Sequence, residues 1–197
     1  MITAIVLAAG ESKRMGAANK LLLPFGETTL IGRVVSAVTA SATGEVLVVV
    51  GHEAEAVREA LVGHPVTFVH NAHYREGMTT SIHAGVAAAS PEASGFMICL
   101  SDLPLIEPGE LDQLIDAFEG RVREDPQCIV IPVHAGRRGN PVLFSAAYQP
   151  AILTHAGLMG CKGIVKQNPA HVLEVSLPTD HILRDIDPPA AYEALRR

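Results

Sequence analysis

The amino-acid sequence predicts an α/β protein, a three-layer sandwich with helices on both faces of a mostly parallel β-sheet. Short apolar runs recur along the chain without alternating polar residues, as is typical of strands buried on both faces. Helical segments separate these runs through the first two thirds of the chain, and such alternation indicates parallel strands joined by right-handed crossovers. The chain contains no long linker, repeat or low-complexity segment, so we expect residues 1–197 to form a single domain.

The expected elements follow one another in regular order. The strands are short runs rich in Val, Ile and Leu: Ala4–Leu7, Val46–Val50, Val66–Val69, Phe96–Leu100, Ile129–Pro132, Val142–Phe144 and Val172–Val175. The helices lie between and after them: Leu30–Ala40, Ala54–Leu61, Thr80–Ala89, Gly109–Glu124 and Pro189–Arg196. The order becomes less regular after the fifth strand. Because Val142–Phe144 follows a Gly-rich turn, we expect it to pair antiparallel at one edge of the sheet.

The composition argues against several classes of protein. The formal net charge of −6 argues against a nucleic-acid partner, because proteins that bind duplexes carry a basic excess. Three cysteines without a CxxC pattern argue against a disulfide framework or a zinc site and favour a reducing compartment. The sequence has neither a signal-peptide pattern nor an apolar run of the ~18 residues that span a bilayer, so we expect a soluble, cytoplasmic protein without a membrane partner.

The segment from Leu7 to Lys20 predicts a nucleotide-phosphate site. An apolar strand runs into a turn of small residues, where the backbone can approach a ligand closely. Arg14 and Lys20 follow, and cations placed there can neutralise a polyphosphate while N–H groups of the turn hold its oxygens. A P-loop is ruled out because Gly10 and Gly16 enclose five residues, and the GxGxxG fingerprint is missing as well. The alternative is an ordinary strand–turn–helix with solvated charges.

This segment resembles the signature of the MobA-like nucleotidyltransferases, and more narrowly the branch that contains molybdenum cofactor cytidylyltransferase. The shared positions are Leu7-Ala8-Ala9-Gly10-x-Ser12-x-Arg14-Met15-Gly16-x-x-Asn19-Lys20. The resemblance implies a Rossmann-like fold of the nucleotide-diphospho-sugar transferase type and Mg²⁺-dependent transfer of a nucleotidyl group from a nucleoside triphosphate. It implies that Arg14 and Lys20 are catalytic and bind phosphates. The nucleotide-binding turn is implied to comprise Leu7, Ala8, Ala9 and Gly10.

Two acidic segments are candidates for a Mg²⁺ site. Asp102 follows the buried run Phe96–Leu100 and therefore projects at the carboxyl edge of the sheet, where Mg²⁺ could join it to phosphate oxygens. Asp185 and Asp187 stand two residues apart, so in an extended segment both face the same side. The resemblance implies that Asp102 is the principal metal ligand and a catalytic residue, and that one of the C-terminal acids completes the site. Helix capping is the alternative for Asp102 and Asp187.

Further site residues are assigned through the resemblance. Asn71 and Ser81 are implied as nucleotide contacts, although capping of the following helix would also explain the hydroxyl side chains there. The acceptor side is implied to include Arg137, Arg138, Asn140 and Lys162. Residues 160–165 depart from the family pattern, because Cys161 and Val165 stand where an aspartate and an arginine are usual. This departure leaves the identity of the acceptor open.

The leading hypothesis is a cytidylyltransferase that transfers CMP from CTP to a molybdopterin-type cofactor and releases pyrophosphate. An acceptor phosphate is already an anion at neutral pH, so the reaction requires charge neutralisation and in-line alignment rather than a general base. One alternative is the same chemistry with GTP or another phosphorylated acceptor. Another is a non-catalytic protein that delivers the cofactor to a molybdoenzyme. A dinucleotide-binding protein is disfavoured by the missing glycine fingerprint.

Overall fold

The computed structural model describes residues 1–11, 19–157 and 160–186, and it confirms the mixed α/β class. A mostly parallel sheet has the strand order β10-β7-β9-β6-β1-β4-β5, with β8 paired to β7. The strands of this sheet are β1 (Ile2–Ala8), β4 (Glu45–Val50), β5 (Thr67–His70), β6 (Gly95–Leu100), β7 (Ile129–His134), β8 (Arg137–Arg138), β9 (Val142–Ser145) and β10 (Val172–Ser176). A separate hairpin is formed by β2 (Pro24–Phe25) and β3 (Thr28–Thr29).

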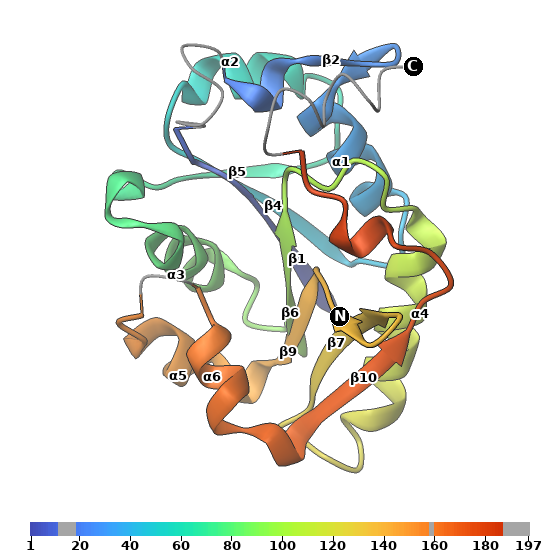
Figure 1. Ribbon diagram of the computed structural model, residues 1–197. Coiled ribbons are helices and arrows are strands. Elements are labelled where there is room, and N and C mark those ends of the chain that lie inside the picture. The colour runs from blue at the N-terminus through green and yellow to red at the C-terminus, as the bar shows by residue number, and fades with distance from the viewer. Residues whose placement is uncertain (12–18, 158–159, 187–197) are drawn as a thin grey trace.

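Helices cover both faces of the sheet, as the sequence predicts. They are α1 (Leu30–Thr39), α2 (Ala54–Ala60), α3 (Met78–Ala88), α4 (Pro108–Arg121), α5 (Gln149–Thr154) and α6 (Lys162–Gln167). Figure 1 shows α1 and α4 on one side of the sheet and α3, α5 and α6 on the other. The expected helix Pro189–Arg196 lies outside the described residues. Among the residues that are described, no helix is both long enough and apolar enough to cross a membrane.

Side chains of the strands contribute to two hydrophobic cores, one on each face of the sheet. In β1, the side chains of Ala4 and Val6 pack in the core beneath α1, α2 and α4, whereas Ile5 packs in the core beneath α3, α5 and α6. Successive side chains of a strand point to opposite faces. A strand between two such cores must therefore be apolar throughout, which explains the unbroken apolar runs of the sequence.

The expected antiparallel strand is present as β9, but it lies inside the sheet rather than at its edge. It pairs antiparallel with both β6 and β7. Its residues Leu143 and Phe144 are 0% and 1% exposed, because strands flank β9 on both sides and helices cover both faces. The chain reverses direction between β7 and β9 at Ala135 and Gly136, whose φ angles are 47° and 76°. A strand without charged residues is better stabilised in such an interior position than at a solvent-exposed edge.

The connections between the strands create a crevice at the carboxyl ends of β1 and β6. From β1 the chain passes through α1 to β4 and through α2 to β5, all on one side of β1. It then crosses the opposite face through α3 and enters β6 on the other side of β1. The loops that follow two such neighbouring strands diverge, and ligands of doubly wound sheets bind between them. In this protein these loops carry Gly10 and Asp102.

Gly85 allows α3 to pack closely on the sheet. A Cβ at this position would lie 2.3 Å from Ile5 Cγ2 and 3.1 Å from Val49 Cγ2. We expect Gly85→Ala to lower the free energy of unfolding by about 1–3 kcal/mol, because the core has no room for another methyl group. Urea denaturation measures the change. Gly120→Ala in α4 is the matched control, since no atom lies within 4 Å of an added Cβ there. Equal destabilisation by both substitutions would contradict the steric explanation.

Candidate functional site

The turn after β1 and the turn after β6 are held together by hydrogen bonds. Ser101 Oγ donates to the carbonyl oxygen of Leu7 at 2.6 Å, which ties the ends of the two strands. Ala9 accepts a hydrogen bond of 3.1 Å from the backbone N–H of His52, which follows β4. The next residue, Gly10, is exposed, and a Cβ added there would meet no atom of the described residues within 4 Å. None of these residues therefore blocks the approach of a ligand to the glycine backbone.

Lys20 reaches across the crevice to Asp102. Lys20 Nζ donates to Asp102 Oδ2 at 2.8 Å, and the two side chains are only 14% and 18% exposed. The lysine begins the 3₁₀ helix Lys20–Leu22, which Asn19 caps by accepting a hydrogen bond of 3.1 Å from the N–H of Leu21. The cap fixes the backbone from which Lys20 extends. The structure thus brings together two residues that the sequence separates by 82 positions.

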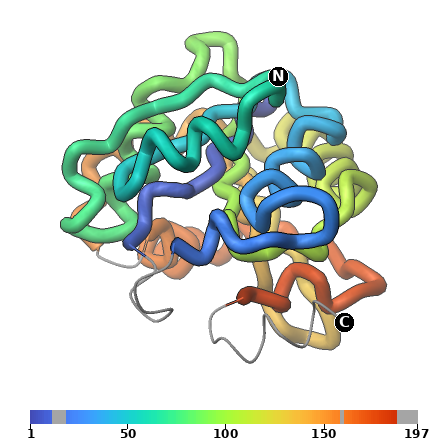
Figure 2. The backbone as a smooth tube through the Cα atoms, turned by 90° about the horizontal axis from the view of Figure 1, so that it is seen from above, coloured from blue at the N-terminus to red at the C-terminus, as the bar shows by residue number. Residues whose placement is uncertain are grey.

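The C-terminal acidic segment lies against the same pair. Ile186 N donates to the carbonyl oxygen of Asp102 at 3.0 Å, and Lys20 Nζ donates to the carbonyl oxygen of Ile186 at 3.3 Å. Figure 2 shows the blue segment around Lys20 beside the red end of the described chain. Asp185, the residue before Ile186, is exposed. Asp185, one of the two acidic residues expected at the metal site, therefore lies in the segment that contacts Asp102.

One carboxylate oxygen of Asp102 has no partner among the residues that the structure describes. Its Oδ1 is buried and accepts no hydrogen bond from the described residues. Buried carboxylate oxygens are normally paired, so an unpaired one indicates a group that a ligand or ion satisfies. Mg²⁺ suits this donor set, because it takes one or two carboxylates together with phosphate oxygens and water. Across the described part of the chain, no cluster of three or more His, Cys, Asp or Glu side chains could hold a metal without such additional ligands.

A network around Glu110 holds the C-terminal segment in place. Glu110 is buried in the first turn of α4, where its side chain accepts a hydrogen bond of 2.9 Å from the N–H of Glu107 and completes a capping box. The same carboxylate accepts a hydrogen bond from the hydroxyl of Thr179, and its Oε2 lies 3.1 Å from His181 Nδ1. The sequence analysis missed this network. The only local sequence signal of this network is the capping-box spacing of Glu107 and Glu110, and that spacing does not identify Thr179 and His181 as partners of Glu110.

The side chains of Asn71 and Ser81, the predicted nucleotide contacts, form a hydrogen bond with each other. Asn71 Nδ2 donates to Ser81 Oγ at 3.0 Å and to Thr80 Oγ1 at 2.9 Å, while its Oδ1 accepts from the N–H of His73. Asn71 and Ser81 are 4% and 5% exposed. These side chains fix the loop after β5 to α3. Of the remaining predicted residues, Arg14 and Asp187 lie outside the described part of the chain.

Three of the four predicted acceptor-side residues border a large cavity. Its volume is about 660 Å³, and its lining includes Arg138, Asn140 and Lys162. Arg137 is exposed and does not contribute to this lining. Lys166, which the sequence analysis missed, lies on the cavity wall one helical turn after Lys162. The four-residue spacing of the two lysines is the signal that could have identified it, once a helix is recognised there.

Cys161, which departs from the family pattern, also lines the cavity. It is 8% exposed, and burial raises the pKa of its thiol to about 11. The thiol is therefore neutral near pH 7 and is a poor nucleophile. Burial likewise raises the pKa of Cys99 to about 12. Cys161 thus contributes a small, weakly polar surface to the cavity wall rather than a reactive group.

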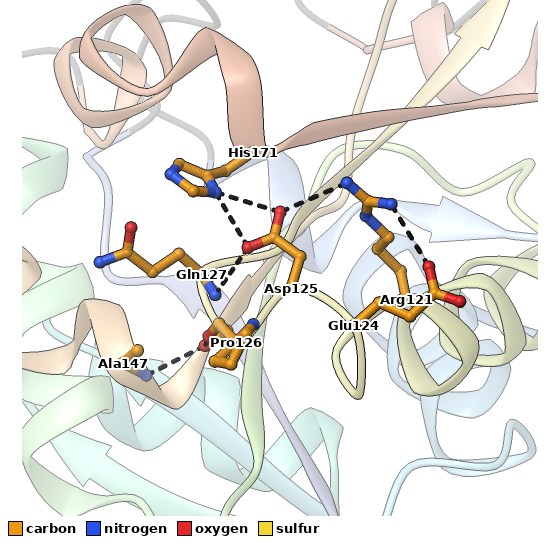
Figure 3. Close-up of polar contacts among 8 residues, drawn as sticks. Arg121, Glu124, Asp125, Pro126, Gln127, Ala147 and His171 are labelled. Atoms are coloured by element: carbon orange, nitrogen blue, oxygen red, sulfur yellow. Dashed lines mark hydrogen bonds and ion pairs between the residues drawn. The ribbon is translucent and has the colours of Figure 1, made fainter.

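A separate polar cluster joins the loops before β7 and β10. Figure 3 shows the carboxylate of Asp125 between His171 and Arg121. His171 Nδ1 lies 2.9 Å and 3.0 Å from its two oxygens, and the N–H of Gln127 donates to Oδ1 at 3.1 Å. Desolvation by burial opposes ionisation of Asp125. The hydrogen bonds from His171 and Gln127, together with the charges of His171 and Arg121, outweigh this effect. The pKa of Asp125 is therefore lower than its usual value.

The lowered pKa makes the contribution of Asp125 to stability depend on pH. A carboxyl group that binds protons more weakly in the folded than in the unfolded state stabilises the fold above its unfolded pKa, and this contribution is lost as the pH falls through the folded value. We therefore expect Asp125→Asn to lower Tm at pH 7, with a difference from wild type that shrinks toward pH 3. Calorimetry over this pH range measures it, with Asp116→Asn at an exposed position of α4 as the control. A difference independent of pH would contradict the assignment.

A doubly wound sheet that presents a lysine, a carboxylate and a glycine turn to one crevice is the architecture of a nucleotidyltransferase. The chain belongs to the family of MobA-like NTP transferase domains, and the match extends over residues 4–172.

Two relatives match nearly the whole chain at equal identity. Nicotine blue oxidoreductase of Paenarthrobacter nicotinovorans is 28% identical over 188 residues, which cover 94% of this chain and 92% of the relative. Molybdenum cofactor cytidylyltransferase of Escherichia coli (strain K12) is 28% identical over 193 residues, which cover 92% of this chain and 94% of the relative. Sequence identity alone therefore does not distinguish between these two relatives as guides to the substrate.

Solved structures confirm the fold. The protein Rv0371c of Mycobacterium tuberculosis H37Rv has a TM-score of 0.85 and 27% identity, with 98% of this chain and 96% of that chain covered. A nucleotidyl transferase from Methanothermobacter has a TM-score of 0.84 and 26% identity, with 100% and 96% covered. A structure of Rv0371c in complex with manganese has a TM-score of 0.74 and 28% identity, with 99% and 97% covered. A similar protein therefore binds a divalent cation.

Proposed function

We propose that the chain, acting as one domain over residues 1–197, transfers CMP from CTP to a molybdopterin-type acceptor in a Mg²⁺-dependent reaction that releases pyrophosphate. The observation that carries this proposal is the pair of Lys20 and Asp102 at the switch point of the sheet, with Asp102 Oδ1 buried and unpaired among the described residues. The cytidylyltransferase relative and the manganese complex of a similar structure support the nucleotide and the divalent cation.

Lys20 would exchange partners when the triphosphate enters the crevice. In the structure, its ammonium group lies 2.8 Å from Asp102 Oδ2 and neutralises this carboxylate. A lysine side chain is a flexible point charge, so the same group can turn to a β- or γ-phosphate oxygen and stabilise the charge that develops on departing pyrophosphate. Asp102 then presents both carboxylate oxygens to the crevice. Mg²⁺ bound there would neutralise phosphate charge and orient the α-phosphate for attack.

The other proposed residues surround this pair. The Leu7–Gly10 segment would bind the nucleotide through its backbone, and this assignment is supported by the absence of any described atom within 4 Å of a Cβ added at Gly10. Asp185 would contribute a second carboxylate, because its segment contacts Asp102 through Ile186. We assign Arg14 to the phosphates and leave Asp187 as the alternative second ligand. Asn71 and Ser81 would meet the nucleotide at the edge of α3, with the loop after β5 held by their mutual hydrogen bond.

Two alternatives compete with this proposal. The same site could use GTP or another phosphorylated acceptor, since the paired charges recognise phosphates rather than a particular base. A protein that delivers a cofactor to a molybdoenzyme could retain the fold without catalysis. The contact between Lys20 and Asp102 supports a catalytic role, because the buried Oδ1 of Asp102, unpaired among the described residues, suits an ion that only a catalytic site requires.

Nucleotide-dependent thermal stabilisation tests the proposed function. We expect CTP with Mg²⁺ to raise Tm more than GTP, ATP or UTP, and to do so more weakly when Mg²⁺ is omitted. A ligand at 100 times its Kd stabilises the folded state by about 2.7 kcal/mol. Preference for GTP would overturn the choice of base. Indifference to all four triphosphates in the presence of Mg²⁺ would overturn the transferase proposal.

A further inference from the structure

The segment 177–186 follows β10 and reaches the crevice, where it carries Asp185. Its backbone is hydrogen-bonded to distant elements. The carbonyl oxygen of Ile182 accepts a hydrogen bond of 3.2 Å from the loop before β9, and Ile186 N donates to the carbonyl oxygen of Asp102 at 3.0 Å. The side chains of Ile182 and Ile186 are 2% and 0% exposed, so the segment packs into the protein. The place of Asp185 beside Asp102 therefore depends on what holds this segment.

Glu110 contacts the segment with both of its carboxylate oxygens. Its Oε1 accepts a hydrogen bond from the hydroxyl of Thr179, and its Oε2 lies 3.1 Å from His181 Nδ1. Because an ionised carboxylate only accepts hydrogen bonds, the imidazole donates from Nδ1. Glu110 lies in the first turn of α4, where the helix dipole favours its negative charge. Hydrogen bonds to a charged acceptor are roughly twice as strong as neutral ones, so these contacts tether the segment firmly.

Capping of α4 does not by itself explain a buried carboxylate at position 110. The cap needs only the hydrogen bond from the N–H of Glu107. Glu110 is 6% exposed, and burial of a charged group costs free energy unless the group is paired and hydrogen-bonded. Here the additional donors come from residues 69 and 71 positions further along the chain. The carboxylate therefore serves the segment 177–186 as well as the helix.

We propose that Glu110 is a positioning residue for the metal site. By holding Thr179 and His181, it keeps Asp185 and the backbone of Ile186 beside the proposed principal ligand. Glu110 acts through the segment and contacts neither the nucleotide nor the cation. The inference rests on the proposed function, because only there does Asp185 bind a cation. Residues that orient metal ligands typically contribute about 10–100-fold to metal affinity, so we expect loss of the tether to weaken cation binding.

Titration with Mn²⁺ in the presence of CTP tests the positioning role. The double variant Thr179→Val/His181→Phe removes both donors of the segment and leaves Glu110 with its capping hydrogen bond. We expect its affinity for Mn²⁺ to fall about tenfold or more. Thr179→Ser keeps the hydroxyl group and should bind Mn²⁺ as tightly as wild type. Equal affinities of the double variant and wild type would overturn the inference.

Asp125→Asn is the control for a general loss of stability. Asp125 and His171 also form a carboxylate–imidazole pair beside β10, but this pair lies at the amino ends of β7 and β10, at the opposite end of these strands from the crevice. The control should lose stability at neutral pH and keep the Mn²⁺ affinity of wild type. If both variants lose the same affinity, destabilisation explains the effect and Glu110 has no positioning role.

Hydrogen exchange of the Ile186 amide tests the tether without metal or nucleotide. In wild type this amide is hydrogen-bonded to Asp102, so its exchange requires local opening of the segment. The double variant should exchange it about tenfold faster or more, and Asp125→Asn should not. Unchanged exchange would overturn the inference, as would faster exchange with unchanged Mn²⁺ affinity. Failure of wild type to bind Mn²⁺ with CTP would instead refute the proposed function, even where the exchange data confirm the tether.

Discussion

Asp102→Asn should reduce metal-dependent release of pyrophosphate by about a thousandfold or more while the protein stays folded. Asparagine keeps the shape of the side chain and can still accept a hydrogen bond from Lys20, but the partly buried ammonium group loses its counter-ion, so we expect a loss of about 1–3 kcal/mol in stability. Asparagine also lacks the negative charge that would hold a divalent cation against the phosphates, and charge neutralisation by a metal is worth several kcal/mol in the transition state. Pyrophosphate release with CTP, Mg²⁺ and an acceptor that supports wild-type turnover measures the effect.

The control for this substitution is Asp116→Asn, which removes an equal charge from an exposed position of α4. We expect the control to retain wild-type activity. Turnover of the Asp102→Asn protein within a few fold of wild type would exclude Asp102 as the metal ligand. Because Asp102 also contacts the C-terminal segment through its backbone, which the substitution leaves intact, loss of activity would not reflect displacement of that segment.

Lys20→Met should have two separable effects. The first is a loss of about 10²–10³-fold in kcat/KM for the triphosphate, the usual consequence of removing one donor that stabilises transition-state charge. The second concerns stability: Asp102 is 18% exposed and would lose its counter-ion, so we expect a loss of about 1–3 kcal/mol in the absence of metal. Mg²⁺ or Mn²⁺ should restore part of this stability, because the cation replaces the ammonium charge beside the carboxylate.

Chemical denaturation of Lys20→Met with and without Mn²⁺ tests the second effect. The matched control is Lys20→Arg, which keeps the charge but differs in shape and should preserve stability better than activity. If Mn²⁺ stabilises wild type and Lys20→Met equally, the lysine and the cation do not share Asp102. That result would contradict the partner exchange proposed for Lys20.

The sheet was largely predictable because its strands are buried on both faces. Uninterrupted apolar runs marked β1, β4, β6 and β7 to within a few residues of their ends. The interior place of β9 was not predictable, because strand order depends on pairing between distant segments and not on local pattern. The short helices α5 and α6 were missed for another reason: six residues are too few to establish a helical period.

The candidate site was predictable where topology determines it. Asp102 and Gly10 follow neighbouring parallel strands, and Leu7 and Ala8 are the last residues of β1; the carboxyl ends of such strands must meet at one edge. The contact of Lys20 with Asp102 could not be predicted, because it depends on the path of the chain between β1 and α1, and the sequence of that segment has no periodic pattern. The support of the C-terminal segment by Glu110, Thr179 and His181 was likewise out of reach, since these residues come from elements far apart in sequence.

Binding of Mn²⁺ in the presence of CTP tests the central claim most directly, because it needs no acceptor. Calorimetric titration should show one site on the wild-type protein and an affinity at least about tenfold lower for Asp102→Asn, which corresponds to about 1.4 kcal/mol. The unpaired Oδ1 of Asp102 is the oxygen that this measurement probes. Equal affinities of the two proteins for Mn²⁺ with CTP would show that the crevice between β1 and β6 does not hold the metal at Asp102.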